Sequence, residues 1–201
     1  MHESTMHDQN LEHFIMQEPV LLCGDDDKPL KAFSLGTSTL YPVPQLARFV
    51  LRAHADGLKR AASAWGLEVP AILRASSSQD RHLLWQGPDE YLLLALVRDV
   101  DEIKASLAAV MDGHPYSLVE VSHRNQAFLL TGERVEQLLA TGLMLDLSVH
   151  AFPVGMTTRT LFAKADITLW RKDLQTFHVE IGRSFAPYMI GLLKSNGMGL
   201  D

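Results

Sequence analysis

Histidine and cysteine are the residue types in this chain with the most immediate capacity for metal binding or catalysis. The nine histidines are scattered singly, without an H-x-x-x-H or H-E-x-x-H spacing, so no pair is predicted to hold zinc from one helix face. The single cysteine, Cys23, excludes an intrachain disulfide and a Cys-x-x-Cys motif, and nothing near it marks a nucleophile. We therefore expect no metal ligands and no catalytic residues of these types.

Phosphate-binding and hydrolase motifs are also missing from the sequence. Lys194-Ser195 resembles the end of a Walker motif, but Tyr188 and Leu193 occupy the positions of its two glycines. No G-x-G-x-x-G follows a predicted strand, and no G-x-S-x-G surrounds a serine. The sequence thus predicts no catalytic and no cofactor-binding residues in this chain.

Two segments carry polar groups that ordinary packing does not explain. The first is WQGPDEY, in which Asp89 and Glu90 lie at a predicted hairpin tip between Trp85 and Tyr91. A turn alone explains Gly, Pro and Asp, whereas the flanking aromatics suit a protein interface, and both alternatives stay open. In the second segment Arg183 lies at the start of a predicted helix. Its charge opposes the helix dipole there, so we expect a carboxylate partner in this chain or another.

Apolar periodicity predicts the elements that position these segments. Alternation predicts strands and an i, i+3, i+4 spacing predicts helices. The predicted strands cover residues 48–53, 71–75, 81–86, 91–97, 116–122, 126–131, 158–164, 167–171 and 177–181. The predicted helices cover residues 56–65, 99–111 and 133–140, with a last helix starting at Ser184.

The order of these elements favours an α+β fold of mostly antiparallel sheets with helices on one side. Similar element orders divide residues 46–201 into possible halves at 46–115 and 116–195, although no sequence repeat accompanies them. Residues 1–45 are polar and rich in Ser, Thr and Pro, and we expect an extended or partly disordered arm there.

Composition limits the partners and the compartment of the protein. Eighteen Lys and Arg against 24 Asp and Glu give a formal charge of −6 over 201 residues, which argues against nucleic acid as the main partner. No apolar run reaches the ~20 residues of a membrane helix. The start of the chain lacks the pattern of a secretory signal. We expect a cytoplasmic protein.

Three segments together carry a family resemblance. They are WQGPDEYLLL (Trp85–Leu94), LDLSVHAFPVGMTTRTLFAKADITLWR (Leu145–Arg171) and FHVEIGRSFAPYMIGLL (Phe177–Leu193). In order and spacing they resemble the gamma subunit of heterotetrameric sarcosine oxidase, over residues 46–193. A weaker similarity, in Val119–Leu147, is to the aminomethyltransferase or glycine-cleavage T-protein fold, which implies a folate-binding-like architecture.

The resemblance implies a complex that oxidatively demethylates sarcosine to glycine. It implies alpha, beta and delta subunits as partners, which are expected to hold FAD, FMN, NAD, zinc and tetrahydrofolate, while the gamma chain holds no cofactor. This chain would then be a non-catalytic structural or assembly subunit of an oxidoreductase acting on a CH–NH bond. The alternatives are a stand-alone folate-binding or aminomethyl-transfer protein, or a gamma-like subunit of a related N-methyl amino acid dehydrogenase.

Family motif position selects the candidate residues for subunit contact or for its support, and Asp89 and Glu90 are also selected by their place at the hairpin tip. The candidates are Trp85, Asp89, Glu90, Arg159, Lys164, Arg171 and Arg183.

Overall fold

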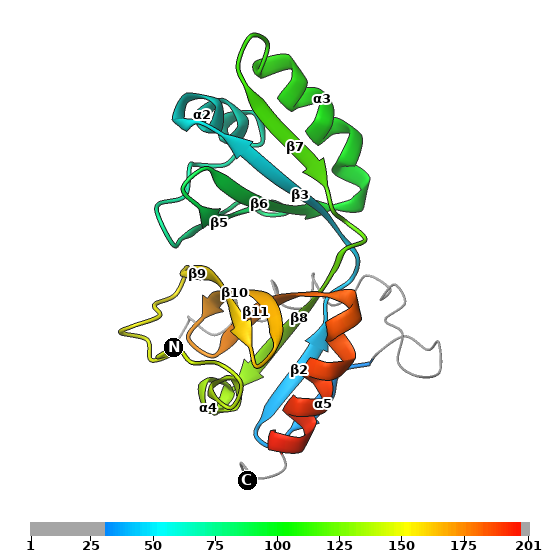
Figure 1. The fold of residues 1–201 in the computed structure, drawn as a ribbon, viewed down its shortest axis with the longest axis vertical. Coiled ribbons are helices and arrows are strands. Elements are labelled where there is room, and N and C mark those ends of the chain that lie inside the picture. The colour runs from blue at the N-terminus through cyan, green and yellow to red at the C-terminus, as the bar shows by residue number, and fades with distance from the viewer. Residues whose placement is uncertain (1–30, 198–201) are drawn as a thin grey trace, which may run out of the picture.

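A computed structural model describes residues 31–197, which form two antiparallel β-sheets and four α-helices (Figure 1). The five-stranded sheet has the order β4-β5-β6-β3-β7. Its strands are β3 (Leu46–Ala53), β4 (Ala75–Ser77), β5 (His82–Gly87), β6 (Glu90–Leu96) and β7 (Tyr116–Glu120). The six-stranded sheet has the order β1-β2-β8-β11-β10-β9. Its strands are β1 (Phe33–Leu35), β2 (Ser38–Pro42), β8 (Asn125–Gly132), β9 (Thr157–Phe162), β10 (Ala165–Asp173) and β11 (Thr176–Gly182).

Two helices cover the outer face of the five-stranded sheet. They are α2 (Ala55–Ala64) and α3 (Val100–Val110), the latter preceded by the 3-10 turn η1 (Val97–Asp99). Because side chains alternate along a strand, Phe49 and Leu51 of β3 lie on one face of the sheet and Arg48 and Val50 lie on the other. Phe49 and Leu51 enter the cluster that holds Trp65, Ile103 and Leu107, which fixes this face of the sheet against the helices.

The other two helices cover the outer face of the six-stranded sheet. They are α4 (Val135–Ala140) and α5 (Ala186–Gly197), with the 3-10 turn η2 (Arg183–Phe185) leading into α5. Phe128 and Leu130 of β8 pack in one cluster with Leu138, Phe177 and Met189. Alternation then leaves Ala127 and Leu129 for the opposite face of the sheet.

The inner faces of the two sheets pack against each other, so the molecule has four layers in the order helix, sheet, sheet, helix (Figure 1). A third cluster fills the middle layer. Leu84, Leu92 and Leu94 of the five-stranded sheet contribute to it, as do Leu129 and Trp170 of the six-stranded sheet. None of the helices within residues 31–197 is long and apolar enough to cross a membrane.

The five-stranded half is one continuous stretch of chain inserted into the six-stranded half. Residues 46–120 contain all its strands, whereas β2 precedes this stretch and β8, the partner of β2, follows it. The two crossing segments, 43–45 and 121–124, are tied to neighbouring strands. Val43 N donates to Ala127 O at 2.9 Å, and Val121 N donates to Arg48 O at 2.8 Å.

The fold confirms the α+β prediction, with antiparallel sheets that each carry helices on one side. Three details differ from the sequence-based expectation. Residues 33–42, expected in the arm, form β1 and β2 of the six-stranded sheet, and residues 1–30 lie outside the described residues. β7 pairs with β3 and so belongs to the first half, not the second. Residues 71–74 form a turn in place of a strand, because Leu73 has a φ of 57°.

Gly132, at the end of β8, packs closely against the backbone at the start of β2. It has a φ of +140°, and a Cβ there would lie 2.5 Å from Thr37 O and 2.6 Å from Ser38 Cα. Gly132→Ala should therefore lower the free energy of unfolding by about 2 kcal/mol or more, since backbone must move. Gly191→Ala on α5 is the control, because its Cβ would meet open space. Urea unfolding of both variants measures this, and equal stabilities would contradict the prediction.

Candidate functional site

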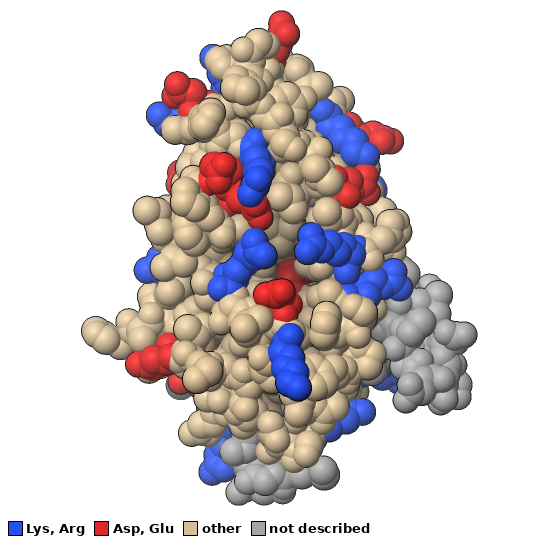
Figure 2. Space-filling model, in the orientation of Figure 1, with Lys and Arg blue, Asp and Glu red and all other residues tan. Residues whose placement is uncertain are grey.

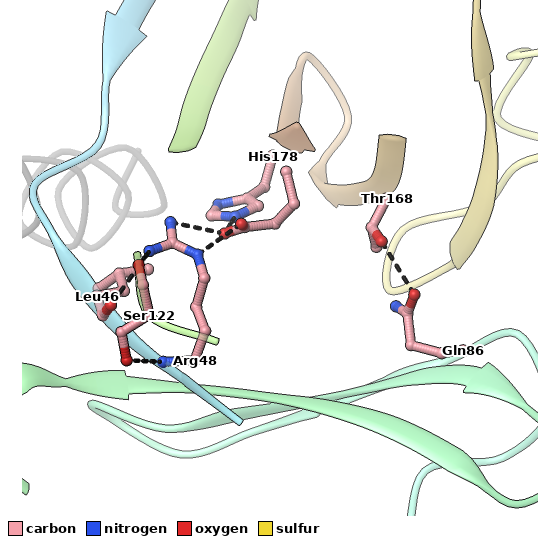
Figure 3. A network of polar contacts seen from close by, with 7 residues as sticks. Leu46, Arg48, Gln86, Ser122, Thr168 and His178 are labelled. Atoms are coloured by element: carbon pink, nitrogen blue, oxygen red, sulfur yellow. Dashed lines mark hydrogen bonds and ion pairs between the residues drawn. The ribbon is translucent and has the colours of Figure 1, made fainter. Parts of the chain in front are cut away.

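A buried ion pair crosses the layer between the two sheets. Arg48 of β3 donates from Nε to Glu180 Oε2 of β11 at 2.6 Å, and from Nη2 to Glu180 Oε1 at 3.1 Å (Figure 3). Both residues are almost fully buried, at 2% and 1% exposure. A two-point arginine–carboxylate contact in such surroundings is strong, and it offsets the cost of removing both charges from water only while both partners are present. The pair therefore fixes the register of one sheet on the other.

The rest of the Arg48 guanidinium binds one crossing segment, 121–124, and the first residue of β3, which follows the other. Its Nη1 donates to Leu46 O at 3.1 Å and lies 3.5 Å from Ser122 O (Figure 3). The Arg48 backbone N donates to Ser122 Oγ at 3.1 Å. One side chain thus holds together β11, the start of β3 and the crossing segment 121–124.

His178 extends the network on the same face of β11. Its Nε2 lies 3.0 Å from Glu180 Oε1. Burial lowers the pKa of His178, and although Glu180 opposes this, the pKa stays below its usual value. Burial alone would raise the pKa of Glu180, but Arg48 and His178 outweigh it, so this pKa also lies below its usual value. The carboxylate is therefore charged and the imidazole neutral near pH 7.

Further polar contacts join the sheets beside this network. Thr168 Oγ1 donates to Gln86 Oε1 at 3.0 Å (Figure 3). Nearer the surface, Glu90 of β6 lies 3.4 Å from Arg159 Nη1 of β9 and 2.7 Å from Arg52 Nη2. Figure 2 shows lysine and arginine side chains interspersed with acidic ones across the middle of this face. The contacts between the two sheets are thus ionic at the rim as well as in the interior.

An aromatic group accompanies the polar network. The rings of His82 and Trp170 lie 5.0 Å apart, and those of Trp170 and His178 lie 5.8 Å apart. Burial, followed by the charges of Lys172 and His178, lowers the pKa of His82 to about 3. Lys172 Nζ lies 5.0 Å from the Trp170 ring centroid, and burial lowers its pKa to about 8. Both histidines of this layer stay neutral near pH 7.

Several polar groups of this layer bind one another. Glu180 is engaged by two arginine nitrogens and by His178, so its oxygens are occupied as acceptors. A general base near pH 7 needs a pKa close to 7, and neither His82 nor Glu180 has one. Among residues 31–197, no group of three or more His, Cys, Asp or Glu side chains is arranged to hold a metal ion.

The hairpin predicted from WQGPDEY is present, as β5, a turn at Pro88 and Asp89, and β6. Trp85 lies opposite Tyr91 across the hairpin and packs, partly buried, against the core beneath α2 and α3. Asp89 is exposed, whereas Glu90 is only partly exposed because Arg52 and Arg159 bind it. The structure therefore brings two candidates, Glu90 and Arg159, into contact with each other.

Arg171 is fully buried, so its side chain is not part of the surface of this chain. Its guanidinium binds the Glu136 carboxylate of α4, Leu147 O at 2.7 Å and Phe152 O at 2.9 Å. It also contacts the carbonyls of Asp173 and Leu174 in the turn between β10 and β11. Arg171 thus holds three separate segments in place.

Lys164 and Arg183 lie apart from the other candidates. Lys164 is exposed in the turn between β9 and β10, and Arg183 is exposed at the start of η2. Within residues 31–197, no carboxylate lies within ion-pair distance of either side chain. The carboxylate expected beside Arg183 is therefore not supplied by the described part of this chain.

Sequence reasoning missed Arg48, His178 and Glu180 as site residues. A signal was available, because FHVEI places His178 and Glu180 two positions apart on one face of an otherwise apolar strand. Arg48 similarly interrupts the apolar β3. Polar residues in a buried strand need a partner, but the sequence did not show which strands would face each other.

The Arg48–Glu180 pair should carry a large share of the stability of the fold. Arg48→Met leaves a buried carboxylate without its arginine, so the free energy of unfolding should fall by about 3–5 kcal/mol. Arg52→Met is the matched control, because its ion pair with Glu90 is exposed and should be worth at most about 1 kcal/mol. Urea unfolding compares the two, and an Arg48 loss no larger than the Arg52 loss would refute a structural role for the pair.

The buried histidines predict that acid weakens the fold. Below pH 6.5 the unfolded chain protonates His82 and His178 more readily than the folded chain does, since the pKa of each lies below 6.5 in the fold, for His82 at about 3. The unfolded state then binds more protons, so stability falls as the pH drops from 6.5 toward 3. Glu180 adds a further loss below pH 4.5.

Replacing His82 tests this pH dependence. His82→Gln should reduce the slope of unfolding free energy against pH by one proton, about 1.4 kcal/mol per pH unit. The exposed His54→Gln is the comparison variant for a histidine replaced at the surface. Urea unfolding across this pH range gives both slopes, and an unaltered slope in the His82 variant would contradict the assignment.

Comparison with known proteins places this fold in a family. The chain is 27% identical to the sarcosine oxidase gamma subunit of Corynebacterium sp. (strain P-1) over 125 residues, 62% of this chain and 61% of that protein. It is 28% identical to the gamma subunit of an Arthrobacter species over 105 residues, 52% of this chain and 51% of that protein. The alignments therefore span between half and two thirds of these relatives' own lengths.

Solved structures share the fold. A chain of heterotetrameric sarcosine oxidase from Corynebacterium sp. U-96 superposes with a TM-score of 0.76 at 23% identity, over 84% of this chain and 88% of that chain. The glycine-cleavage aminomethyltransferase T of Bartonella henselae superposes with a TM-score of 0.58 at 13% identity, over 79% of this chain and 45% of that chain. The model of the sarcosine oxidase gamma subunit family matches residues 53–197. With most of its length matched, this chain belongs to the sarcosine oxidase gamma subunit family.

Proposed function

We propose that this chain is the gamma subunit of a heterotetrameric sarcosine oxidase, a complex that oxidatively demethylates sarcosine to glycine. The observation that carries the proposal is the family match over residues 53–197, a range that includes strands of both sheets and all four helices. The complex is an oxidoreductase acting on a CH–NH bond, and this chain serves it as an assembly subunit and takes no part in the chemistry.

The packing between the sheets supports a non-catalytic role. In the related aminomethyltransferase fold the same layers form part of an enzyme, but in this chain Arg48, Glu180 and His178 bind one another across the layer. Charged groups that satisfy each other in a buried network add to stability and specificity of the fold and leave no unpaired charge for a substrate. The layer therefore acts as a scaffold.

The cofactors of the complex belong, in this proposal, to the partner chains. FAD, FMN, NAD, zinc and tetrahydrofolate would be held by the alpha, beta and delta subunits. The complex would work in the cytoplasm, without nucleic acid or membrane as a partner.

The candidate contact residues divide into two roles under this proposal. Asp89, Lys164 and Arg183 are exposed and would face a partner subunit, and the guanidinium of Arg183, which pairs with no carboxylate of residues 31–197, would meet one there. The other candidates would support the surface from within this chain, through the packing or ion pairs described above. These are Trp85, Glu90, Arg159 and Arg171.

A second candidate function is a stand-alone folate-binding or aminomethyl-transfer protein. The superposition on aminomethyltransferase T favours it as a matter of fold. Titration of the purified chain with tetrahydrofolate tests it, and binding at micromolar ligand would support it over the assembly role. A third candidate is a gamma-like subunit of a related N-methyl amino acid dehydrogenase. The amine substrates that the purified complex oxidises distinguish this candidate from a sarcosine oxidase subunit.

Purification of the tagged chain with and without its partners tests the main proposal. We expect the chain alone to show no flavin absorbance and no sarcosine-dependent oxidase activity. Co-expressed with the other subunits, it should be recovered in a complex that shows both. Flavin absorbance or oxidase activity of the isolated chain would overturn the assembly role, as would its recovery alone from the co-expression.

A further inference from the structure

The buried guanidinium of Arg171 holds an irregular loop in a fixed conformation. This loop, residues 143–156, joins α4 to β9 and contains no helix or strand. Arg171 donates to Leu147 O at 2.7 Å and to Phe152 O at 2.9 Å, so its side chain binds the loop at two points. The Arg171 backbone binds it again, because Arg171 N donates to Met156 O and Gly155 N donates to Arg171 O.

Packing reinforces these hydrogen bonds. Leu143, Leu147 and Phe152 point into the core of the six-stranded half and are buried. The rings of Phe152 and Phe177 lie 6.2 Å apart, and the Arg171 guanidinium lies 4.8 Å from the Phe177 ring centroid. A loop fixed in this way loses little conformational freedom on binding, which is the general route by which preorganisation raises affinity.

The larger side chains that this fixed loop turns outward are mostly apolar, beside the exposed Asp146, Ser148 and His150. Met144 is 100% exposed and Val149 is 46% exposed, with Leu145 and Val154 also on the surface. Leu174, in the turn that Arg171 also binds, is 59% exposed. We call these five residues the apolar patch: Met144, Leu145, Val149, Val154 and Leu174.

Charge is scarce in the loop that carries the patch. Its 14 residues include no Lys or Arg and one carboxylate, Asp146, which accepts a hydrogen bond from Ser148 N within the loop. Depletion of charge together with clustered apolar side chains distinguishes the centre of a protein interface from ordinary surface. The partner that fits is therefore itself apolar and poor in charge.

Shape indicates which kind of molecule this partner is. The loop projects from the side of the six-stranded half (Figure 1), and in the space-filling view the same place is a largely uncharged protrusion (Figure 2). Two copies of a convex protrusion do not complement each other, as a two-fold symmetric dimer through this patch would require. A concave apolar surface on a different chain does complement it.

We propose that the apolar patch docks into an apolar groove on another subunit of the complex. This inference rests on the proposed function and adds to it the surface that makes the contact. Exposed apolar side chains gathered on one surface commonly mark interaction sites on proteins. It would supply the centre of a standard interface, about 800 Å² on each partner, with the exposed charged candidates at its rim.

Placing charge on the patch tests the proposal. The double variant Met144→Asp/Val149→Asp changes only exposed side chains, so the isolated chain should melt at the same temperature as the unaltered chain. On co-expression with the other subunits, recovery of the variant in the complex should fall roughly tenfold or more, since buried carboxylates would lack partners. The matched control is Val97→Asp, an exposed valine (49%) in the other half, which should assemble normally.

The outcomes separate this inference from the proposed function. Normal assembly of the unaltered chain and of the double variant overturns the docking site and leaves the proposed function standing. Failure of the unaltered chain to assemble at all overturns the proposed function, and the docking site with it. A double variant that melts normally but is lost from the complex, beside a control that is retained, supports the docking site.

Oxidation of Met144 gives a second test that needs no substitution. Because Met144 is fully exposed in the chain alone, dilute hydrogen peroxide should convert it rapidly to the sulfoxide. In the assembled complex the same thioether should be protected, with an oxidation rate at least tenfold lower by peptide mass spectrometry. Equal rates in the free chain and the complex would place the patch outside the interface and overturn the proposal.

Discussion

The ion pair between Arg48 and Glu180 is the contact on which the arrangement of the two sheets depends. Apolar side chains fill much of the layer around it, but apolar packing alone tolerates sliding of one sheet on the other. A two-point contact between a guanidinium and a carboxylate does not tolerate such sliding, because moving one partner leaves a buried charge unpaired. The same arginine binds the first residue of β3 and the crossing segment 121–124, so sheet packing and one chain connection are fixed at one place.

Arg171 plays the corresponding part on the outer side of the six-stranded sheet. It substitutes for regular secondary structure by supplying donors to carbonyls that no strand or helix satisfies. The fold thus uses two buried arginines for two purposes: one holds the interior together, and the other gives an irregular surface loop a fixed shape. This division would suit the assembly role proposed above.

Sequence reasoning predicted the elements better than their assembly. The apolar runs of β3, β6 and β11 and the helical stripes of α2 and α3 specified those elements, because each pattern depends on residues close together in the chain. It did not predict that β7 pairs with β3, or that β2 pairs with β8, because strand pairing depends on residues far apart in the chain. For the same reason Glu90 and Arg159 were selected singly, by hairpin position or motif, and their contact was not foreseen.

The insertion of one half of the protein into the other has a consequence for biosynthesis. β2 emerges from the ribosome early, yet its pairing partner β8 follows only after residues 43–124 have been made. The five-stranded half, which is continuous in the chain, can form first, whereas the six-stranded sheet must wait with its edges unpaired. During that interval the nascent chain exposes the edge of β2 that later pairs with β8, and such edges are prone to aggregation, so co-translational encounter with a partner subunit would protect this early strand.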